Sequence, residues 1–192
     1  MPSQDTFFAR LVSLACHDLR TPLATVHGFA RTIERTQKLE EPLARYVEMI
    51  NAAAGQLTDL LGTLSTVARI EARRYEPLVV ETDTLDLAHS AADRVTGASA
   101  EGAGMSVWTD AEQIERSLAA FASCAIRHGA APSVTLRVDG KTVVLKPVNE
   151  SARAVILGEE LRDLGAAAAV LIVRSLGGSV ELDGDALRVT LA

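Results

Sequence analysis

The segment HDLRTPL, residues 17–23, brings together residue types that can carry out group transfer. His17 has an imidazole, whose neutral form is a nucleophile. Asp18 follows directly and can rotate to hydrogen-bond the ring, which would fix its tautomer or take up its proton. Thr21 lies one helical turn on, where its hydroxyl can hold a water or an oxygen atom beside the ring. Pro22 costs about 3 kcal/mol inside an ordinary helix, because it leaves a backbone carbonyl without its partner.

The element that carries this segment is predicted to be a long amphipathic helix. Its apolar residues recur at the spacing of one helix face: Phe8, Leu11, Val12, Ala15, Leu19, Leu23, Val26, Ala30 and Ile33. His17 lies two positions from both Ala15 and Leu19, about 200° round the axis, so its side chain is predicted to point to solvent. Four further residues on this outward side are predicted to contact a partner protein: Ser13, Leu14, Arg20 and Ala24.

A second long helix is predicted after a short loop. Its apolar residues keep a heptad spacing from Leu43 to Ala68, and Pro42 suits the first position of a helix. Two such helices form an antiparallel hairpin, which cannot cover both apolar stripes. We therefore expect a homodimer in which two hairpins form a four-helix bundle. Ser3 or Asp5 is expected to cap the first helix.

The sequence changes character near residue 75, and an α+β domain is expected from there to the end. Helices are predicted over residues 84–95, 110–128 and 159–176, and strand pairs around the turns at residues 139–140 and 183–185. Residues 96–104, rich in Gly, Ser and Ala, are expected to be loose chain, and Asn149 and Glu150 are expected to lie in a loop. Such a pattern predicts an antiparallel-rich sheet with helices on one face, forming an α/β sandwich.

The composition argues against several function classes. The net charge of −6, with scattered basic residues, argues against a nucleic-acid partner. The longest apolar run, residues 166–173, is too short to span a bilayer, and the N-terminus has no signal pattern, so we expect a cytoplasmic protein without a membrane partner. Cys16 and Cys124 are expected to be free thiols. Cys124 and His128 have an i, i+4 spacing that can bind metal, but two ligands alone do not make a site.

Residues 1 to about 72 resemble the dimerisation and phosphoacceptor domain of two-component sensor histidine kinases, because HDLRTPL is similar to the H-box of that family. The resemblance implies that His17 is the phosphorylated residue. It also implies that Asp18 is the acid–base residue of phosphoryl transfer and that Thr21 positions water when a response regulator is dephosphorylated. Pro22 would correspond to the proline that kinks this helix in the family.

The second half resembles the ATP-binding domain of those kinases, most clearly in SVWTDAEQIERSLAAFASCAIRHGA and LIVRSLGGSVEL. Three parts of the family's nucleotide site are altered. Cys124 stands where the family has its Mg²⁺-binding Asn, and a thiol is a poor ligand for a hard cation. NESARAV replaces the Asp–x–Gly–x–Gly turn that reads adenine. The lid, GEELRDLGAAAAV, has Ala where glycines would cradle the phosphates.

We therefore predict a histidine phosphotransferase with a phosphoacceptor domain over residues 1–74 and a degenerate ATP-binding-like domain over residues 75–192. It would relay a phosphoryl group between aspartates of response-regulator receiver domains through His17, without ATP and without autokinase activity. No tightly bound cofactor or metal is expected, and the receiver would supply Mg²⁺. The alternatives are an ATP-dependent sensor kinase with an atypical pocket, a non-catalytic dimeric scaffold, and a response-regulator phosphatase that uses Thr21.

Overall fold

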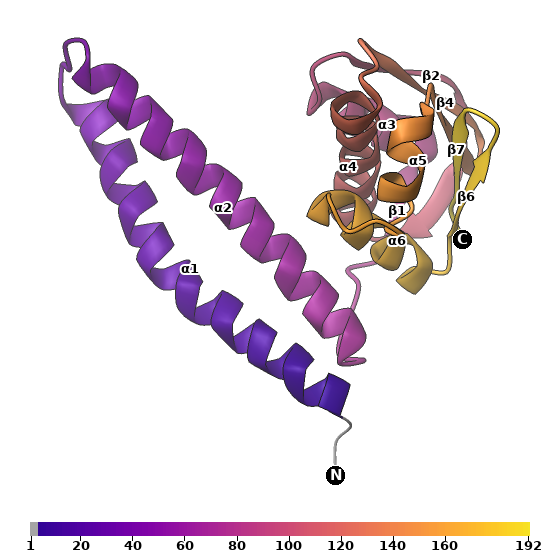
Figure 1. The fold of residues 1–192 in the computed structure, drawn as a ribbon, viewed down its shortest axis with the longest axis horizontal. Helices are drawn as coiled ribbons and strands as arrows, with labels where there is room; N and C mark the ends of the chain where they lie inside the picture. Colours follow the sequence, from indigo (N-terminus) through magenta and orange to yellow (C-terminus); the bar gives the residue numbers. More distant parts are fainter. Residues whose placement is uncertain (1–3) are drawn as a thin grey trace. The chain divides into compact units, whose positions relative to one another are not determined.

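The computed structural model describes residues 4–192, with side chains described from residue 8 onward. The chain divides into two compact units, Met1–Tyr75 and Glu76–Ala192 (Figure 1). The caps predicted at Ser3 or Asp5 lie outside the described side chains. Within the described residues, none of the helices has the length and apolar character needed to span a membrane.

The first unit is a hairpin of two long helices, α1 (Gln4–Thr36) and α2 (Leu43–Glu71), as the sequence predicts (Figure 1). Helix α1 continues through Pro22 without interruption. Its most buried positions recur at every seventh residue: Ala9, Cys16, the half-buried Leu23, and Ala30. On α2 the same spacing links the half-buried Val47, Ala54, the half-buried Leu61, and Ala68. A heptad seam with many alanines lets the two helices approach each other closely.

The apolar stripe predicted for the first helix is divided between two faces of α1. Ala30 is buried, whereas Leu19 and Val26 are 54% and 51% exposed and Ala15 is exposed as well. The predicted stripe was wider than one helix can cover, because a single neighbour buries one row of side chains spaced by seven. Four other apolar residues of α1 form a second row spaced by seven that is largely exposed in the single chain: Val12, Leu19, Val26 and Ile33.

The second unit has a small sheet and a large sheet. The small sheet pairs β1 (Val80–Asp83) with β3 (Ser106–Thr109) in antiparallel orientation. The strands of the large sheet lie in the order β2 (Ala98–Gly104), β4 (Val134–Gly140), β5 (Thr142–Lys146), β7 (Ala186–Thr190) and β6 (Ser179–Asp183). The β2–β4 pair is parallel, and the other pairs are antiparallel.

Helices α3 (Thr84–Asp93), α4 (Ala111–Gly129), α5 (Glu150–Ile156) and α6 (Leu164–Ser175) cover one face of the large sheet (Figure 1). Alternate residues of β4, such as Leu136 and Val138, are buried under these helices, and Arg137 between them is exposed. The α+β class, both strand pairs around the predicted turns and the antiparallel-rich sheet are thereby confirmed.

Three segments differ from the sequence-based prediction. Residues 98–104 form edge strand β2, since pairing with β4 satisfies the backbone even without β-branched side chains. Gly102 permits this pairing, because a Cβ there would lie 2.1 Å from the Val138 carbonyl oxygen. Glu150–Ile156 is a short helix, because Ala152 and Val155 are buried on one side of it. Helix α6 begins at Leu164 rather than at residue 159, because Asp163 caps it.

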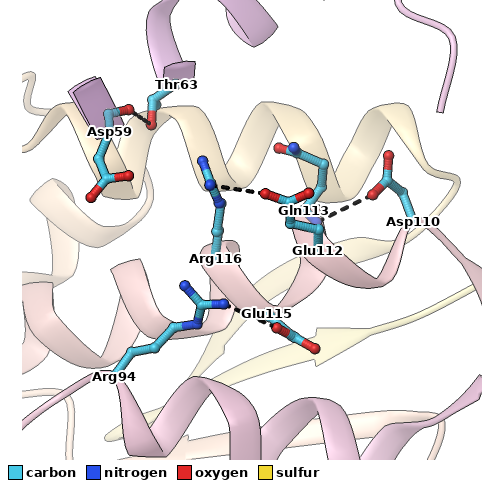
Figure 2. Close-up of polar contacts among 8 residues, drawn as sticks. All are labelled: Asp59, Thr63, Arg94, Asp110, Glu112, Gln113, Glu115 and Arg116. Atoms are coloured by element: carbon cyan, nitrogen blue, oxygen red, sulfur yellow. Dashed lines mark hydrogen bonds and ion pairs between the residues drawn. The ribbon is translucent and has the colours of Figure 1, made fainter. Parts of the chain in front are cut away.

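Helix α4 is the central helix of the second unit and begins at a side-chain cap. The carboxylate of Asp110 accepts a hydrogen bond from the backbone N–H of Gln113 at 3.3 Å (Figure 2). Arg94, just after α3, forms an ion pair of 3.3 Å with Glu115 of α4. The apolar face predicted for this helix is buried: Ile114, Leu118, Phe121 and Ala125. These contacts fix the helix whose last turns carry Cys124 and His128.

Candidate functional site

His17 and Asp18 are in direct contact on the surface of α1. Nδ1 of His17 lies 3.1 Å from Oδ1 of Asp18, and the two side chains are 76% and 67% exposed. Because an ionised carboxylate can only accept hydrogen bonds, this contact places the imidazole proton on Nδ1. The Nε2 lone pair is then free to act as a nucleophile toward a partner molecule. The exposure predicted for His17 is observed.

The seven-residue spacing of α1 explains why this imidazole is exposed. Cys16 belongs to the row buried in the hairpin, and Leu19 belongs to the second apolar row. His17 is 100° round the helix from Cys16 and about 160° from Leu19, so it lies outside both rows. A partner that covered the second row would therefore leave the imidazole accessible.

The other predicted site residues of α1 surround His17 to different degrees. Thr21 is exposed one turn further along, on the side of the helix that carries the imidazole. Leu14 is 57% exposed, although it is apolar. Arg20 and Ala24 are exposed, and Ser13 is half-buried toward the hairpin. The surface beside the imidazole is therefore partly apolar, with small side chains around one exposed leucine.

Cys124 is fully buried in the second unit, at 0% exposure. Burial is the main cause that raises the pKa of its thiol from the ordinary 9.0 to about 12, with a further contribution from the Asp163 carboxylate and a small opposing one from Arg127. The sulfur therefore carries its proton at neutral pH. A protonated, buried thiol offers no charge or oxygen atom to a magnesium ion.

Asp163 organises the start of α6 and is the polar residue that the sequence analysis missed. One carboxylate oxygen accepts the backbone N–H of Ala166 at 3.1 Å, and the backbone carbonyl accepts the N–H of Ala167 at 3.1 Å. The other carboxylate oxygen lies 3.2 Å from Nε2 of His128 and 3.6 Å from the Arg127 guanidinium. An Asp directly before an apolar run is a helix-cap signal that the sequence does contain.

These contacts determine what the N-terminus of α6 can bind. Free backbone N–H groups at a helix start attract anions such as phosphate. Here the Asp163 side chain, which is 6% exposed, already accepts one of these N–H groups and brings a negative charge to the same place. An incoming phosphate would be repelled by this carboxylate.

The two units together have the fold of a histidine kinase core, a helical hairpin followed by a domain with the ATP-binding fold. Residues 9–73 match the family model of the His Kinase A (phospho-acceptor) domain. This matched segment contains the whole His17–Asp18–Thr21 group.

Two curated relatives and one solved structure illustrate the likeness. The histidine protein kinase DivJ of Caulobacter vibrioides is 34% identical over 70 residues, which are 35% of this chain and 12% of DivJ. The probable sensor histidine kinase TcrY of Mycobacterium tuberculosis is 29% identical over 100 residues, 52% of this chain and 20% of TcrY. The crystal structure of full-length ShkA in complex with AMPPNP has a TM-score of 0.65 at 23% identity, over 95% of this chain and 46% of that one. The likeness to ShkA shows the fold, and the matched segments are a minor part of the two curated kinases.

Proposed function

We propose that this chain is a histidine phosphotransferase of a two-component system that relays phosphoryl groups between receiver domains. The observation that carries the proposal is the exposed imidazole whose Nδ1 is held by Asp18 and whose Nε2 faces solvent. In the first step Nε2 attacks the phosphorus of a receiver phospho-aspartate. An N–P bond forms, the P–O bond breaks, and the receiver carboxylate leaves with the electron pair. In the second step a carboxylate of another receiver attacks, and the N–P bond breaks.

Asp18 has a defined part in both steps. When the N–P bond forms, the ring becomes cationic, and the carboxylate 3.1 Å from Nδ1 stabilises that charge. When the phosphoryl group leaves, the same contact holds the proton on Nδ1 and the ring in position. The predicted partner-facing residues of α1 bring no further carboxylate, so the Mg²⁺ that neutralises the phosphoryl oxygens is expected from the receiver.

Two features of the second unit support a role without ATP. The N-terminus of α6 is capped by Asp163, whose charge opposes a phosphate there. Cys124 presents a buried, protonated thiol at the position where the resemblance implies a magnesium ligand. The described residues at these two places do not fit magnesium-bound ATP, and no step of the proposed transfer uses it.

A homodimer is part of the proposal, because each helix of the hairpin carries a second row of apolar residues spaced by seven. On α1 the row is Val12, Leu19, Val26 and Ile33, and on α2 it is Leu43, Ile50, Leu57 and Leu64. Apart from the half-buried Val12 and Leu64, these residues are 41% to 58% exposed in the single chain. Pairing two hairpins through these rows gives a four-helix bundle and leaves His17 outside it.

Receiver domains are expected to dock on α1 around His17. Leu14 is one turn before the imidazole and offers an apolar contact, while Ala24 allows close approach. Arg20 can pair with the acidic residues that surround a phospho-accepting aspartate. Ser13, half-buried toward the hairpin, marks one edge of this surface.

A second candidate, an ATP-dependent sensor kinase with an atypical pocket, is favoured by one observation. The ShkA structure that shares this fold contains AMPPNP. In this case the second unit would bind ATP and phosphorylate His17. A phosphatase that uses Thr21 and a non-catalytic scaffold are further alternatives. The kinase, the phosphatase and the scaffold each differ from the relay in whether the protein becomes phosphorylated and in which phosphoryl donor phosphorylates it.

The relay is tested with two receiver domains. The first is radiolabelled on its aspartate with acetyl phosphate and purified, and the second is unlabelled. The proposal predicts that label moves to the second receiver only when this protein is present, with labelled protein as an intermediate. Release of inorganic phosphate without labelled protein or second receiver would instead support the phosphatase, and absence of any transfer would support the scaffold.

A further inference from the structure

A cluster of three metal-ligating side chains, not used by the proposed phosphotransfer, lies in the second unit. Cys124 and His128 are one turn apart on α4, and Asp163 lies directly before α6. One ligand atom from each, the thiol sulfur, a ring nitrogen and a carboxylate oxygen, lies within 4.8 Å of the other two. The side chains of His128 and Asp163 are 16% and 6% exposed, and Cys124 is fully buried. The sequence analysis identified Cys124 and His128 as a possible ligand pair, and the fold brings Asp163 beside them.

The distances within this cluster suit a tetrahedral metal ion. Zinc binds nitrogen and oxygen at about 2.0–2.1 Å and sulfur at about 2.3 Å, so tetrahedral ligands lie about 3.3 Å apart for an N–O pair and about 3.6 Å for pairs with sulfur. Nε2 of His128 and Oδ2 of Asp163 are already 3.2 Å apart. The Cys124 sulfur lies within 4.8 Å of the other two ligand atoms, so it needs to come closer by up to about 1.2 Å, which a rotation of its side chain or a small shift of α6 provides.

We propose that Cys124, His128 and Asp163 bind one Zn²⁺ ion, with water in the fourth position. These ligands suit zinc rather than the magnesium ion that accompanies ATP in kinases, because magnesium requires oxygen ligands and near-octahedral geometry. A thiolate, an imidazole and a carboxylate are the ligands that zinc takes in proteins. This proposal does not rest on the phosphotransfer function.

Protons and charges balance when the ion binds. Cys124 releases its thiol proton to solvent, and His128 binds through Nε2 while its proton resides on Nδ1. The thiolate and the Asp163 carboxylate together neutralise the two charges of zinc. Arg127, whose side chain is 63% exposed and also donates a hydrogen bond to Oγ of Ser123 at 2.9 Å, can turn from Asp163 toward solvent.

The bound ion would fasten the end of α4 to the start of α6. Oδ1 of Asp163 continues to accept the Ala166 N–H, so α6 keeps its cap while Oδ2 turns from the His128 proton to the metal. Zinc would thus occupy the place between these helices and stabilise the second unit.

The test is metal titration of the full chain. Purified apo-protein is titrated with Zn²⁺ in competition with a chromogenic chelator, and separately with Co²⁺ as a spectroscopic probe. The proposal predicts one equivalent of zinc and a thiolate-to-cobalt charge-transfer band. Cys124→Ala should abolish the band, and both Cys124→Ala and Asp163→Asn should weaken zinc binding by about 10–100-fold or more, because each removes a metal ligand. The matched control, Cys16→Ala, removes the other buried cysteine and should change neither result.

The Asp163→Asn variant is expected to keep its fold, because Asn caps helices as well as Asp does. A loss of zinc binding in this variant therefore cannot be attributed to misfolding. Without metal its circular dichroism should match that of the parent protein, and its melting temperature should lie close to that of the parent. Tight zinc binding that survives both Cys124→Ala and Asp163→Asn would overturn the proposal. So would a cobalt complex of the parent without the charge-transfer band, or zinc binding no stronger than that of the Cys124→Ala protein.

Discussion

The polar side chains of the two units differ in exposure and in hydrogen bonding. In the helical hairpin the His17 and Asp18 side chains are 76% and 67% exposed, and the imidazole keeps one nitrogen free. In the α/β unit the Asp163 side chain is 6% exposed and is bonded to the start of α6 and to His128. A nucleophile for a macromolecular partner must be exposed, whereas a site for an anion such as phosphate needs N–H groups that are not already paired. The exposed His17–Asp18 pair suits the proposed chemistry with a partner, whereas the Asp163 carboxylate joins the start of α6 to His128 of α4.

The largest effect is expected from His17→Ala. The proposed relay passes through the His17 imidazole, so without it transfer between receivers should be lost completely. Labelling of the protein by a phosphorylated receiver, followed on gels, measures this. The control is His89→Ala, which removes an exposed histidine of α3 in the second unit and should retain full labelling. Labelling that persists in His17→Ala would move the chemistry to another residue.

A charge in the second apolar row should prevent formation of the proposed dimer. Val26 is 51% exposed in the single chain, and Val26→Glu would bury a carboxylate in the proposed four-helix bundle. Light scattering should then report a monomer. Leu14→Glu, an equally exposed position outside the row, should leave a dimer and instead weaken receiver docking. Equal dimerisation of parent and Val26→Glu would refute the assigned interface.

Asp18→Asn should slow transfer without preventing it. The amide keeps a polar group beside the ring but cannot stabilise the cationic ring as a carboxylate does, so the rate should fall by about 100-fold. Single-turnover transfer from a labelled receiver gives this rate. Direct phosphorylation of His17 by phosphoramidate should be little changed, because the imidazole stays exposed. An unchanged transfer rate would show that Asp18 has no part in the chemistry.

Asp163→Ala should destabilise the second unit by about 1–2 kcal/mol, because α6 loses its cap. Chemical denaturation in the presence of a chelator measures this free energy of unfolding. Asp163→Asn should recover most of the loss, since its side-chain oxygen can accept the Ala166 N–H. If both variants lost the same free energy, the carboxylate charge rather than the cap would be the stabilising feature.

The last effect concerns Cys124 and develops only at high pH. Its pKa is raised from 9.0 to about 12 in the folded protein, chiefly by burial, so above pH 9 the thiol ionises in the unfolded chain first. Below pH 9 the thiol is protonated in both states, and its contribution to the free energy of unfolding is fully present. Above pH 9 the free energy of unfolding falls by about 1.4 kcal/mol per pH unit as the pH rises toward 12. The free energy of unfolding of the parent should therefore decline more steeply between about pH 9 and about pH 11 than that of Cys124→Ala, with chelator present. Parallel slopes would contradict the effect of burial.

The sequence was sufficient for features set by local periodicity and turn chemistry. The hairpin, helix α4 and both strand pairs follow from apolar spacing and from Asp–Gly turns. The exposure of His17 was predicted from its angle to Leu19, but Leu19 is itself exposed and the buried neighbour is Cys16. The sequence was insufficient where tertiary contacts decide. Strand β2 depends on pairing with β4, and the triad of Cys124, His128 and Asp163 depends on how α6 meets α4. The cap signal at Asp163 was present but could not reveal its contact with His128.

One comparison of phosphoryl donors tests the central claim most directly. The protein is incubated with Mg²⁺ and γ-labelled ATP in one reaction, and with Mg²⁺ and a labelled phospho-receiver in the other, and the label is mapped to a residue by mass spectrometry. We predict phosphohistidine at His17 from the receiver and none from ATP. Phosphohistidine formed from ATP, at a rate equal to that from the receiver, would contradict the ATP-independent relay and establish the kinase instead.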